Sequence, residues 1–225
     1  MSTAYFVTGT DTGVGKTLVS CALLRAFVAQ GKKALGMKPI AAGCQVVAEG
    51  MDCEDVERLM AAGNVAAPRA GVNPYAFQPA IAPHIAAAQA GVEISLERIA
   101  EAFARLNGLA DVVVVEGVGG WRVPLNDRED TADMARRLGL PVILVVGMRL
   151  GCLSHALLTA QAIEASGLRL AGWVANRIDP LMPAFEENLQ ALESRLVVPL
   201  LGVLPYSATP DADSASQYLH TDRLA

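Results

Sequence analysis

The sequence has few of the residues that build disulfide frameworks, zinc sites or hydrolytic triads. Its 225 residues include four cysteines and no Cys-x-x-Cys pair: Cys21, Cys44, Cys53 and Cys152. In an intracellular chain this spacing predicts free thiols rather than disulfides or a zinc site. The three histidines are scattered, and Ser154-His155 lies where a helical pattern begins, so the serine is interpreted as a helix cap and not as a nucleophile.

Long apolar runs and basic clusters are also missing. No segment reaches the roughly 18 uninterrupted apolar residues of a membrane span, so none is expected. The first residues lead directly into a strand pattern without the features of a signal peptide, which favours a cytoplasmic protein. The net charge is −5 and no basic run is present, which argues against a nucleic-acid surface. Length and a 52% apolar content indicate one α/β domain over 1–225, with an irregular tail after about residue 207.

The strongest positive signal is the stretch from Tyr5 to Thr17, which reads Y-F-V-T-G-T-D-T-G-V-G-K-T. An apolar strand, a glycine-rich turn and a helix that starts with Lys-Thr form a phosphate-binding P-loop. Glycines let the backbone approach a phosphate, and N–H groups at the helix start attract the anion. We expect Lys16 to reach the β- and γ-phosphates and the Thr17 hydroxyl to bind Mg²⁺. The first motif position is Thr10 instead of glycine, which indicates a variant subclass.

Strand and helix patterns alternate along the chain, which predicts a P-loop α/β fold with a mostly parallel, doubly wound sheet and helices on both faces. Strands are expected at 34–37, 112–115, 141–146, 170–175 and 199–204, helices near 52–62, 95–106, 130–138 and 183–196, and a loop at 41–51.

Two charged residues come directly after predicted strands. Lys38 follows the strand 34–37, and Pro39 keeps it extended, so it is expected at the sheet edge where open α/β sheets bind ligands. Glu116 follows four valines and resembles a Walker-B carboxylate that holds Mg²⁺. The acidic residues of 52–55 are also candidates for the metal, but spacing alone does not say which one. The helix that begins near Ser154 offers a second free N-terminus for an anion such as a carboxylate.

Several motifs together resemble the dethiobiotin synthetase family, nearly over the whole chain up to about residue 207. They are G-T-D-T-G-V-G-K-T at 9–17, G-M-K-P-I-A-A-G at 36–43, N-P-Y-A-F at 73–77, A-P-H-I at 82–85, V-E-G-V-G-G-W at 115–121, L-G-C-L-S-H-A-L-L-T-A-Q at 150–161 and A-G-W-V-A-N at 171–176. The resemblance implies a cytoplasmic homodimer in biotin biosynthesis that uses ATP, Mg²⁺ and CO₂ (or bicarbonate). The implied reaction closes the ureido ring of dethiobiotin on 7,8-diaminononanoate (7,8-diaminopelargonate), through a carbamate and a carbamic-phosphoric anhydride, and releases ADP and phosphate.

The resemblance also implies roles for individual residues. Lys38 and Lys16 are the implied catalytic residues. The implied magnesium ligands are Thr17, Asp55 and Glu116. The implied nucleotide-binding residues are Gly13, Val14, Gly15, Lys16, Thr17, Leu18, Asp55, Glu116, Gly117, Val118, Gly119, Asn176, Arg177, Pro205, Tyr206 and Ser207. The implied substrate contacts are Thr12, Lys38 and Ala42, together with Gly151, Cys152, Leu153 and Ser154 from the second subunit.

Three positions depart from the family pattern. Gly13 replaces an acidic residue, so any role of that side chain is absent here, and Ala42 replaces a serine that contacts the substrate, so that hydrogen bond is either missing or made by the backbone. Arg177 replaces an acidic residue beside Asn176, which changes the base pocket. The stretch N-R-I-D at 176–179 also resembles the guanine motif N-K-x-D of GTPases. ATP is the expected nucleotide, with some use of GTP as an alternative.

Proteins of other classes share parts of this pattern. A partitioning-type ATPase switch of the deviant P-loop group has a signature lysine five residues before the P-loop lysine, where this chain has Asp11. Such switches also dock on membranes through a basic amphipathic helix that this sequence lacks. An amidation enzyme of the cobyrinic-acid type would need a glutaminase domain, and a P-loop protein that only binds nucleotide would not need both Lys38 and Glu116.

Overall fold

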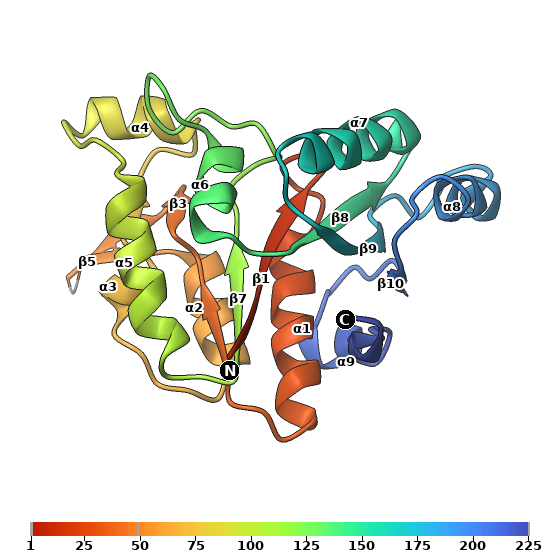
Figure 1. The fold of residues 1–225 in the computed structure, drawn as a ribbon, viewed down its shortest axis with the longest axis horizontal. Coiled ribbons are helices and arrows are strands. Elements are labelled where there is room, and N and C mark those ends of the chain that lie inside the picture. Colours follow the sequence, from red (N-terminus) through yellow and green to blue (C-terminus); the bar gives the residue numbers. More distant parts are fainter. Residues whose placement is uncertain (1, 49, 225) are drawn as a thin grey trace.

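The computed structural model describes residues 2–48 and 50–224 of the chain. Its centre is a six-stranded sheet with the order β10-β9-β8-β1-β7-β2, in which every neighbouring pair is parallel (Figure 1). The strands are β1 (Thr3–Gly9), β2 (Ala34–Met37), β7 (Val112–Glu116), β8 (Val142–Met148), β9 (Leu170–Arg177) and β10 (Leu200–Leu204). The predicted α/β class with a mostly parallel sheet is therefore confirmed.

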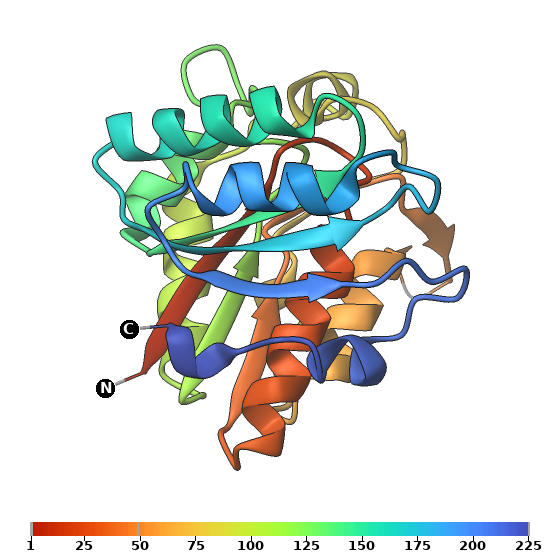
Figure 2. The ribbon, with the colours of Figure 1, turned by 90° about the vertical axis from the view of Figure 1, so that its right-hand side faces the viewer.

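Helices cover both faces of this sheet, as Figures 1 and 2 show. One face carries α1 (Lys16–Ala29), α2 (Glu54–Ala62) and α9 (Ala212–Ser216). The other face carries α5 (Leu96–Asn107), α6 (Thr131–Leu138), α7 (Cys152–Ala165) and α8 (Phe185–Glu193). The shorter α3 (Arg69–Val72) packs on α5 and β2, and α4 (Pro83–Gln89) packs on two short strands described below.

The alternation of side chains along β1 joins the two apolar cores. Phe6 points into one core and contacts Trp121 edge-on, with 6.2 Å between the ring centroids. Tyr5 points into the other core and stacks on Phe27 at the same distance. Burying an aromatic ring of this kind contributes roughly 1.5–3 kcal/mol. Because β1 is buried on both faces, the P-loop that follows it starts from a rigid position.

Parts of the stretch 41–51, predicted as a loop, form short strands instead. β3 (Ile40–Ala42) pairs in parallel with β6 (Tyr75–Phe77), and β4 (Gln45–Val47) forms an antiparallel hairpin with β5 (Gly50–Asp52). Three-residue strands are too short for a period to be recognised. The partner of β3 also lies far away in the sequence, so a local pattern does not reveal it.

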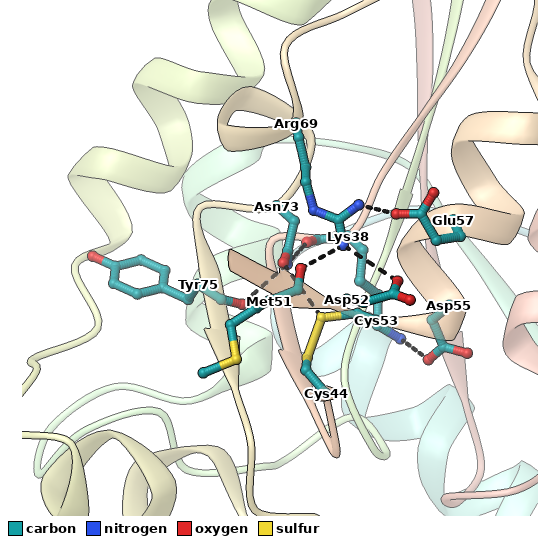
Figure 3. Close-up of a disulfide and its surroundings, with 10 residues drawn as sticks. All are labelled: Lys38, Cys44, Met51, Asp52, Cys53, Asp55, Glu57, Arg69, Asn73 and Tyr75. Atoms are coloured by element: carbon teal, nitrogen blue, oxygen red, sulfur yellow. Dashed lines mark hydrogen bonds and ion pairs between the residues drawn. A yellow bond between two sulfur atoms is a disulfide. The ribbon is translucent and has the colours of Figure 1, made fainter. Parts of the chain in front are cut away.

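The prediction that all four cysteines are free thiols is wrong for two of them. Cys44 and Cys53 form a disulfide with a Cα–Cα distance of 4.4 Å, and both are buried (Figure 3). The β4–β5 hairpin pairs Gln45 with Asp52, so the cysteines come next to each other where the hairpin ends. Spacing along the sequence did not show this pairing. Cys21 and Cys152 are free and buried, and burial raises the pKa of the Cys21 thiol to about 12.

The tail after residue 207 is more ordered than predicted. It contains α9 and a 3₁₀ helix, Thr221–Arg223, and both pack against α1. Arg25 of α1 forms an ion pair with Asp213 at 3.1 Å, and Gln30 Nε2 donates to Thr221 Oγ1 at 2.6 Å. Helices of three to five residues are too short for a sequence pattern to show. In the described part of the chain no helix is long and apolar enough to cross a membrane.

Replacing Gly202 of β10 with alanine should destabilise the protein by about 1–3 kcal/mol, the usual cost of an overpacked site. The new Cβ would lie 2.1 Å from the carbonyl oxygen of Tyr218. This is a backbone atom, so the clash can be relieved only if the C-terminal tail shifts away from β10. Urea unfolding measures the change. Gly71→Ala is the control, because its nearest neighbour, Leu106 Cδ2, lies 3.6 Å away. Equal midpoints for the two variants would contradict this account of the tail.

Candidate functional site

A cavity of about 830 Å³ opens at the carboxyl ends of the sheet strands. Most of the residues that the sequence singled out line it: Thr12, Gly13, Gly15, Lys16, Thr17, Leu18, Lys38, Ala42, Asp55, Glu116, Val118, Gly119, Asn176, Arg177, Pro205, Tyr206 and Ser207. These residues come from seven separate segments of the chain. Position at the carboxyl edge agrees with the general location of ligand sites in open α/β sheets.

The P-loop forms the floor of one half of the cavity. Gly13 and Gly15 have φ angles of 75° and 89°, a backbone region that residues with a Cβ rarely adopt. Lys16 Nζ donates to the carbonyl oxygen of Asp11 at 3.1 Å. The Asp11 carboxylate in turn accepts from Arg149 at 2.6 Å. Burial lowers the pKa of Lys16 to about 8, and the positive charge of nearby Lys38 adds to the effect.

A buried charged cluster lies beside the P-loop, and the register of the sheet builds it. Met37 pairs with Val115, so Lys38 and Glu116 are the next residues on neighbouring strands. Lys38 Nζ lies 2.5 Å from Glu116 Oε1 and 3.1 Å from Asp55 Oδ2. Burial alone would lower the pKa of Lys38, but the charges of these two carboxylates raise it above its usual range. Burial likewise works against ionised Asp55, but the charge of Lys38, the hydrogen bonds from Lys38 and Thr17 and the charge of Lys16 together outweigh it and lower the Asp55 pKa.

The oxygen atoms next to Lys38 have unused capacity for a cation. Thr17 Oγ1 lies 2.9 Å from both Asp55 Oδ1 and Glu116 Oε1, and its single proton can go to only one of them. Glu116 Oε2 is buried and has no hydrogen-bond partner among the described residues. Two carboxylates and a hydroxyl suit Mg²⁺, which prefers oxygen ligands and commonly takes only one or two carboxylates from the protein. No group of three or more His, Cys, Asp and Glu side chains that could hold a metal occurs in 2–48 and 50–224.

The other half of the cavity is formed by the end of β9 and the segment after β10. Asn176 Nδ2 donates to the carbonyl oxygen of Val14 at 2.9 Å, which ties the end of β9 to the P-loop. The Arg177 guanidinium lies 4.7 Å from the centre of the Phe185 ring and donates to the Pro180 carbonyl. Asp179, the last residue of the guanine-like stretch, is not among the lining residues, and its Oδ1 accepts from the backbone of Leu181.

Some of the sequence-predicted site residues do not line the cavity. Val14 is buried and packs under the P-loop beside Gly9 and Gly147. Gly117 follows Glu116 but packs against the ring of Phe6. The segment 151–154 is also absent from the lining, so within one chain it does not reach the cavity.

The start of α7 differs from the prediction in one detail. The residue that caps this helix is Gly151, with φ 96°, so Ser154 lies in the first turn and is not the cap. Glycine has no side chain that could cap the helix, so the sequence pattern gave no sign of a helix start at Gly151. Ser154, three residues later, was the nearest residue of a usual capping type and was therefore predicted as the cap.

Several lining residues were missed at the sequence level: Arg58, Ala80, Ile81, Ala82, Pro83, Val123, Ile178 and Pro210. Arg58 lies three residues after Asp55 on α2, so helical spacing alone would have placed both on one face. The motif A-P-H-I at 82–85 was recognised as part of the family pattern but received no role. Small apolar residues such as these have no chemical signal of their own.

Comparisons with known proteins agree with this geometry. A family described as an AAA domain matches residues 3–214. The ATP-dependent dethiobiotin synthetase BioD of Nitrosospira multiformis is 58% identical over 224 residues, which are 100% of this chain and 97% of that protein. The protein of the same name from Aromatoleum aromaticum is 59% identical over 208 residues, which are 92% of each chain.

Solved structures with the same fold are more distant. The septum site-determining protein MinD of Pyrococcus horikoshii, in complex with Mg-ADP, has a TM-score of 0.57 at 16% identity and covers 99% of this chain and 89% of its own. The MinC:MinD complex of Aquifex aeolicus has the same TM-score at 16% identity, over 96% and 93% of the two chains. At this identity the likeness shows a shared P-loop fold and nothing about activity. Identity of more than half the residues over nearly full length decides the family: the chain belongs to the ATP-dependent dethiobiotin synthetases.

Proposed function

We propose that this chain converts 7,8-diaminononanoate, CO₂ and ATP into dethiobiotin, ADP and phosphate. The observation that carries the proposal is the pair of buried lysines on one cavity. Lys16 follows a P-loop, and Lys38 is held between two carboxylates a short distance away. A nucleotide-binding protein without this chemistry needs only the first lysine. The second one supplies positive charge where a second anion would meet the γ-phosphate.

The proposed sequence of bond changes uses the substrate's own two amines. One amine adds to CO₂ and loses a proton, which gives an anionic carbamate. A carbamate oxygen attacks the γ-phosphorus of ATP, and ADP leaves with the electron pair of the broken P–O bond. The neighbouring amine then attacks the carbonyl carbon of the mixed anhydride, loses its proton and expels phosphate, which closes the ring.

The chain's residues contribute mainly by holding and screening charges. Backbone N–H groups of 13–18 and the Lys16 ammonium would bind the phosphates, and Lys38 would lie between the carbamate and the γ-phosphate. Thr17, Asp55 and Glu116 would hold Mg²⁺, whose charge offsets that of the phosphate oxygens. Lys38 is only 4% exposed, so water screens its charge little.

ATP is the proposed nucleotide, because the guanine-like stretch offers no guanine contact. The acid of the N-K-x-D motif would have to face the base, and here Asp179 Oδ1 accepts from the backbone of Leu181 instead. Arg177, which departs from the family pattern, is held over Phe185 and against Pro180. Asn176 keeps its carbonyl oxygen available to the cavity, since only its amide nitrogen is bonded to Val14.

We also propose that two chains form the working enzyme, through the face that carries α7. Leu158 of α7 is 62% exposed, and Leu150, in the turn just before this helix, is 91% exposed. A second chain on this face would cover them. It would also bring 151–154 of one chain near the cavity of the other, in agreement with the substrate contacts that the family resemblance implies.

The switch-type ATPase has less support. Its signature lysine would occupy position 11, where Asp11 pairs with Arg149 and supports Lys16 through its carbonyl oxygen. An aspartate there repels phosphate oxygens instead of binding them.

The test of this function is ADP release from the purified chain with MgATP and bicarbonate, with and without 7,8-diaminononanoate. Release that depends on the diamine and matches the dethiobiotin formed is the expected result. Hydrolysis of ATP that does not depend on the diamine would contradict the proposed function. Chelation of Mg²⁺ should stop the release, and GTP in place of ATP should support it poorly.

Lys38→Ala should reduce diamine-dependent ADP release by a factor of about 10³ or more, because phosphoryl transfer loses one of its positive charges. ATP binding, measured by calorimetry, should change only a few-fold, since the P-loop contacts remain. Glu116 also loses its buried counter-ion, which should cost about 3 kcal/mol of stability in the absence of Mg²⁺. Lys33→Ala, at the exposed residue just before β2, is the matched control. Full activity of Lys38→Ala would remove Lys38 from the mechanism.

Gly15→Ala should weaken ATP binding about tenfold more than Gly13→Ala. Both positions have positive φ, so both variants have similar backbone strain. Only at Gly15 does a Cβ meet a neighbour, the Asn176 amide at 2.1 Å, whereas the space beside Gly13 is open. The difference between the two dissociation constants therefore isolates the displacement of Asn176. Identical constants would show that Asn176 has no part in nucleotide binding.

Leu158→Asp should convert the proposed dimer into monomers, because a charge buried at an apolar interface costs several kcal/mol. Sedimentation velocity gives the molecular mass of wild type and variant at the same concentration. Leu181→Asp is the control, since Leu181 is 86% exposed but lies outside α7. A wild-type chain that sediments as a monomer would contradict the proposed dimer.

A further inference from the structure

The motif N-P-Y-A-F at 73–77 belongs to the family pattern, yet the mechanism above gives it no role. Its first residue, Asn73, follows α3 and is only 8% exposed. The side-chain amide Nδ2 donates to the carbonyl oxygen of Lys38 at 2.6 Å and to that of Tyr75 at 3.0 Å. Both amide protons are therefore used on backbone carbonyls. In Figure 3 Asn73 lies directly beside Lys38.

The backbone of Lys38 needs such a contact because no strand pairing of the central sheet fixes it. The ladder between β2 and β7 ends with the pair Met37 and Val115, one residue before Lys38. Beyond that point the backbone of Lys38 is fixed from the other side, where its N–H donates to the Val72 carbonyl at 3.0 Å. This backbone bond does not depend on the residue type at 72.

The carbonyl of Lys38 is different, because a side chain binds it. Tyr75 N–H donates to the carbonyl of Pro39 at 3.1 Å, so the segment 72–75 runs alongside residues 38 and 39. Between these two backbone bonds, Asn73 supplies the donor for Lys38. A shorter or apolar side chain at 73 would leave this buried carbonyl without that donor.

The geometry points to Asn73 as a positioning residue for Lys38, an inference that rests on the proposed function of that lysine. By holding the Lys38 carbonyl, Asn73 sets the direction in which the long side chain leaves the backbone. The ammonium then reaches both Glu116 at 2.5 Å and Asp55 at 3.1 Å. Without this bond, the lysine would keep its charge but lose its fixed place beside the reacting groups.

The chain offers a closely matched control at the other end of the same strand. Asn64 Oδ1 accepts from the Ala34 N–H at 2.8 Å, and its Nδ2 donates to the Lys32 carbonyl at 3.0 Å. It therefore supports the start of β2 with two side-chain-to-backbone bonds, as Asn73 supports the residue after its end. Asn64 does not line the cavity.

The experiment compares Asn73→Ala, Asn73→Asp and Asn64→Ala by steady-state kinetics and thermal unfolding. Asn73→Ala should lower kcat for diamine-dependent ADP release about tenfold or more, the effect of one lost hydrogen bond on a barrier. The KM for ATP should stay within about threefold, because the P-loop is unchanged. Asn73→Asp keeps the volume but loses the donors, so it should lower kcat to a similar degree. Asn64→Ala should lower the unfolding temperature while kcat remains near that of wild type.

A second readout does not depend on the enzyme activity. Lys38 is buried and paired, so an amine-acylating reagent should label it slowly in the wild-type protein, as quantified by mass spectrometry of the peptide. Asn73→Ala and Asn73→Asp should increase the labelling rate of Lys38 about tenfold, and Asn64→Ala should not. If the wild type shows no diamine-dependent ADP release, the proposed function fails, and the labelling rates alone decide the role of Asn73.

Two results would overturn the inference. One is a kcat near the wild-type value in both Asn73 variants, with Lys38 labelled at the wild-type rate. The other is an equal loss of kcat in Asn73→Ala and Asn64→Ala at equal thermal stability, which would make the effect a general loss of structure. If Asn73→Ala does not fold, the isosteric Asn73→Asp decides between these outcomes.

Discussion

The ion pair between Lys38 and Glu116 is the interaction on which the rest of the site depends. The Glu116 side chain is fully buried, and a carboxylate so far from water costs several kcal/mol unless a cation and hydrogen bonds balance it. Lys38 Nζ and Thr17 Oγ1 supply that balance at 2.5 Å and 2.9 Å, but the second carboxylate oxygen has no partner among the described residues. Compared with two apolar side chains of similar size, such an intact pair contributes little to stability. It keeps opposite charges together at the place where phosphates and a metal ion would bind.

The register of the parallel sheet explains why these groups meet. β7 lies between β1 and β2, so the residues at its end are neighbours of both the P-loop and the end of β2. Val7 pairs with Glu116 on one side, and on the other side Met37 pairs with Val115, which places Lys38 level with Glu116. A shift of one residue in either pairing would turn the side chains to the opposite face. The positions of the charges therefore follow from apolar strands that take no part in the chemistry.

Much of this arrangement could be predicted from the sequence, because strong local patterns produce it. The strand, glycine turn and Lys-Thr of the P-loop, and the valine run that ends in Glu116, each contain their own signal. The sequence did not reveal contacts between segments that are far apart, such as β3 with β6 or Asn73 with Lys38. The prediction of free thiols was also wrong for Cys44 and Cys53, because the bond between them follows from the hairpin register and not from their spacing.

Asp55 is the member of the charged cluster that the central sheet does not place. It lies in the first turn of α2, two residues after Cys53, which is bonded to Cys44. Cys44 donates its N–H to the carbonyl of Phe77 in β6, the strand that follows Asn73. The disulfide and β6 therefore connect Asp55 with Asn73 and the backbone of Lys38, outside the central sheet. Glu116 and Thr17, in contrast, belong to the sheet and the P-loop. The distance between the Asp55 and Glu116 carboxylates, the two that would hold a metal ion, therefore depends on both parts of the structure.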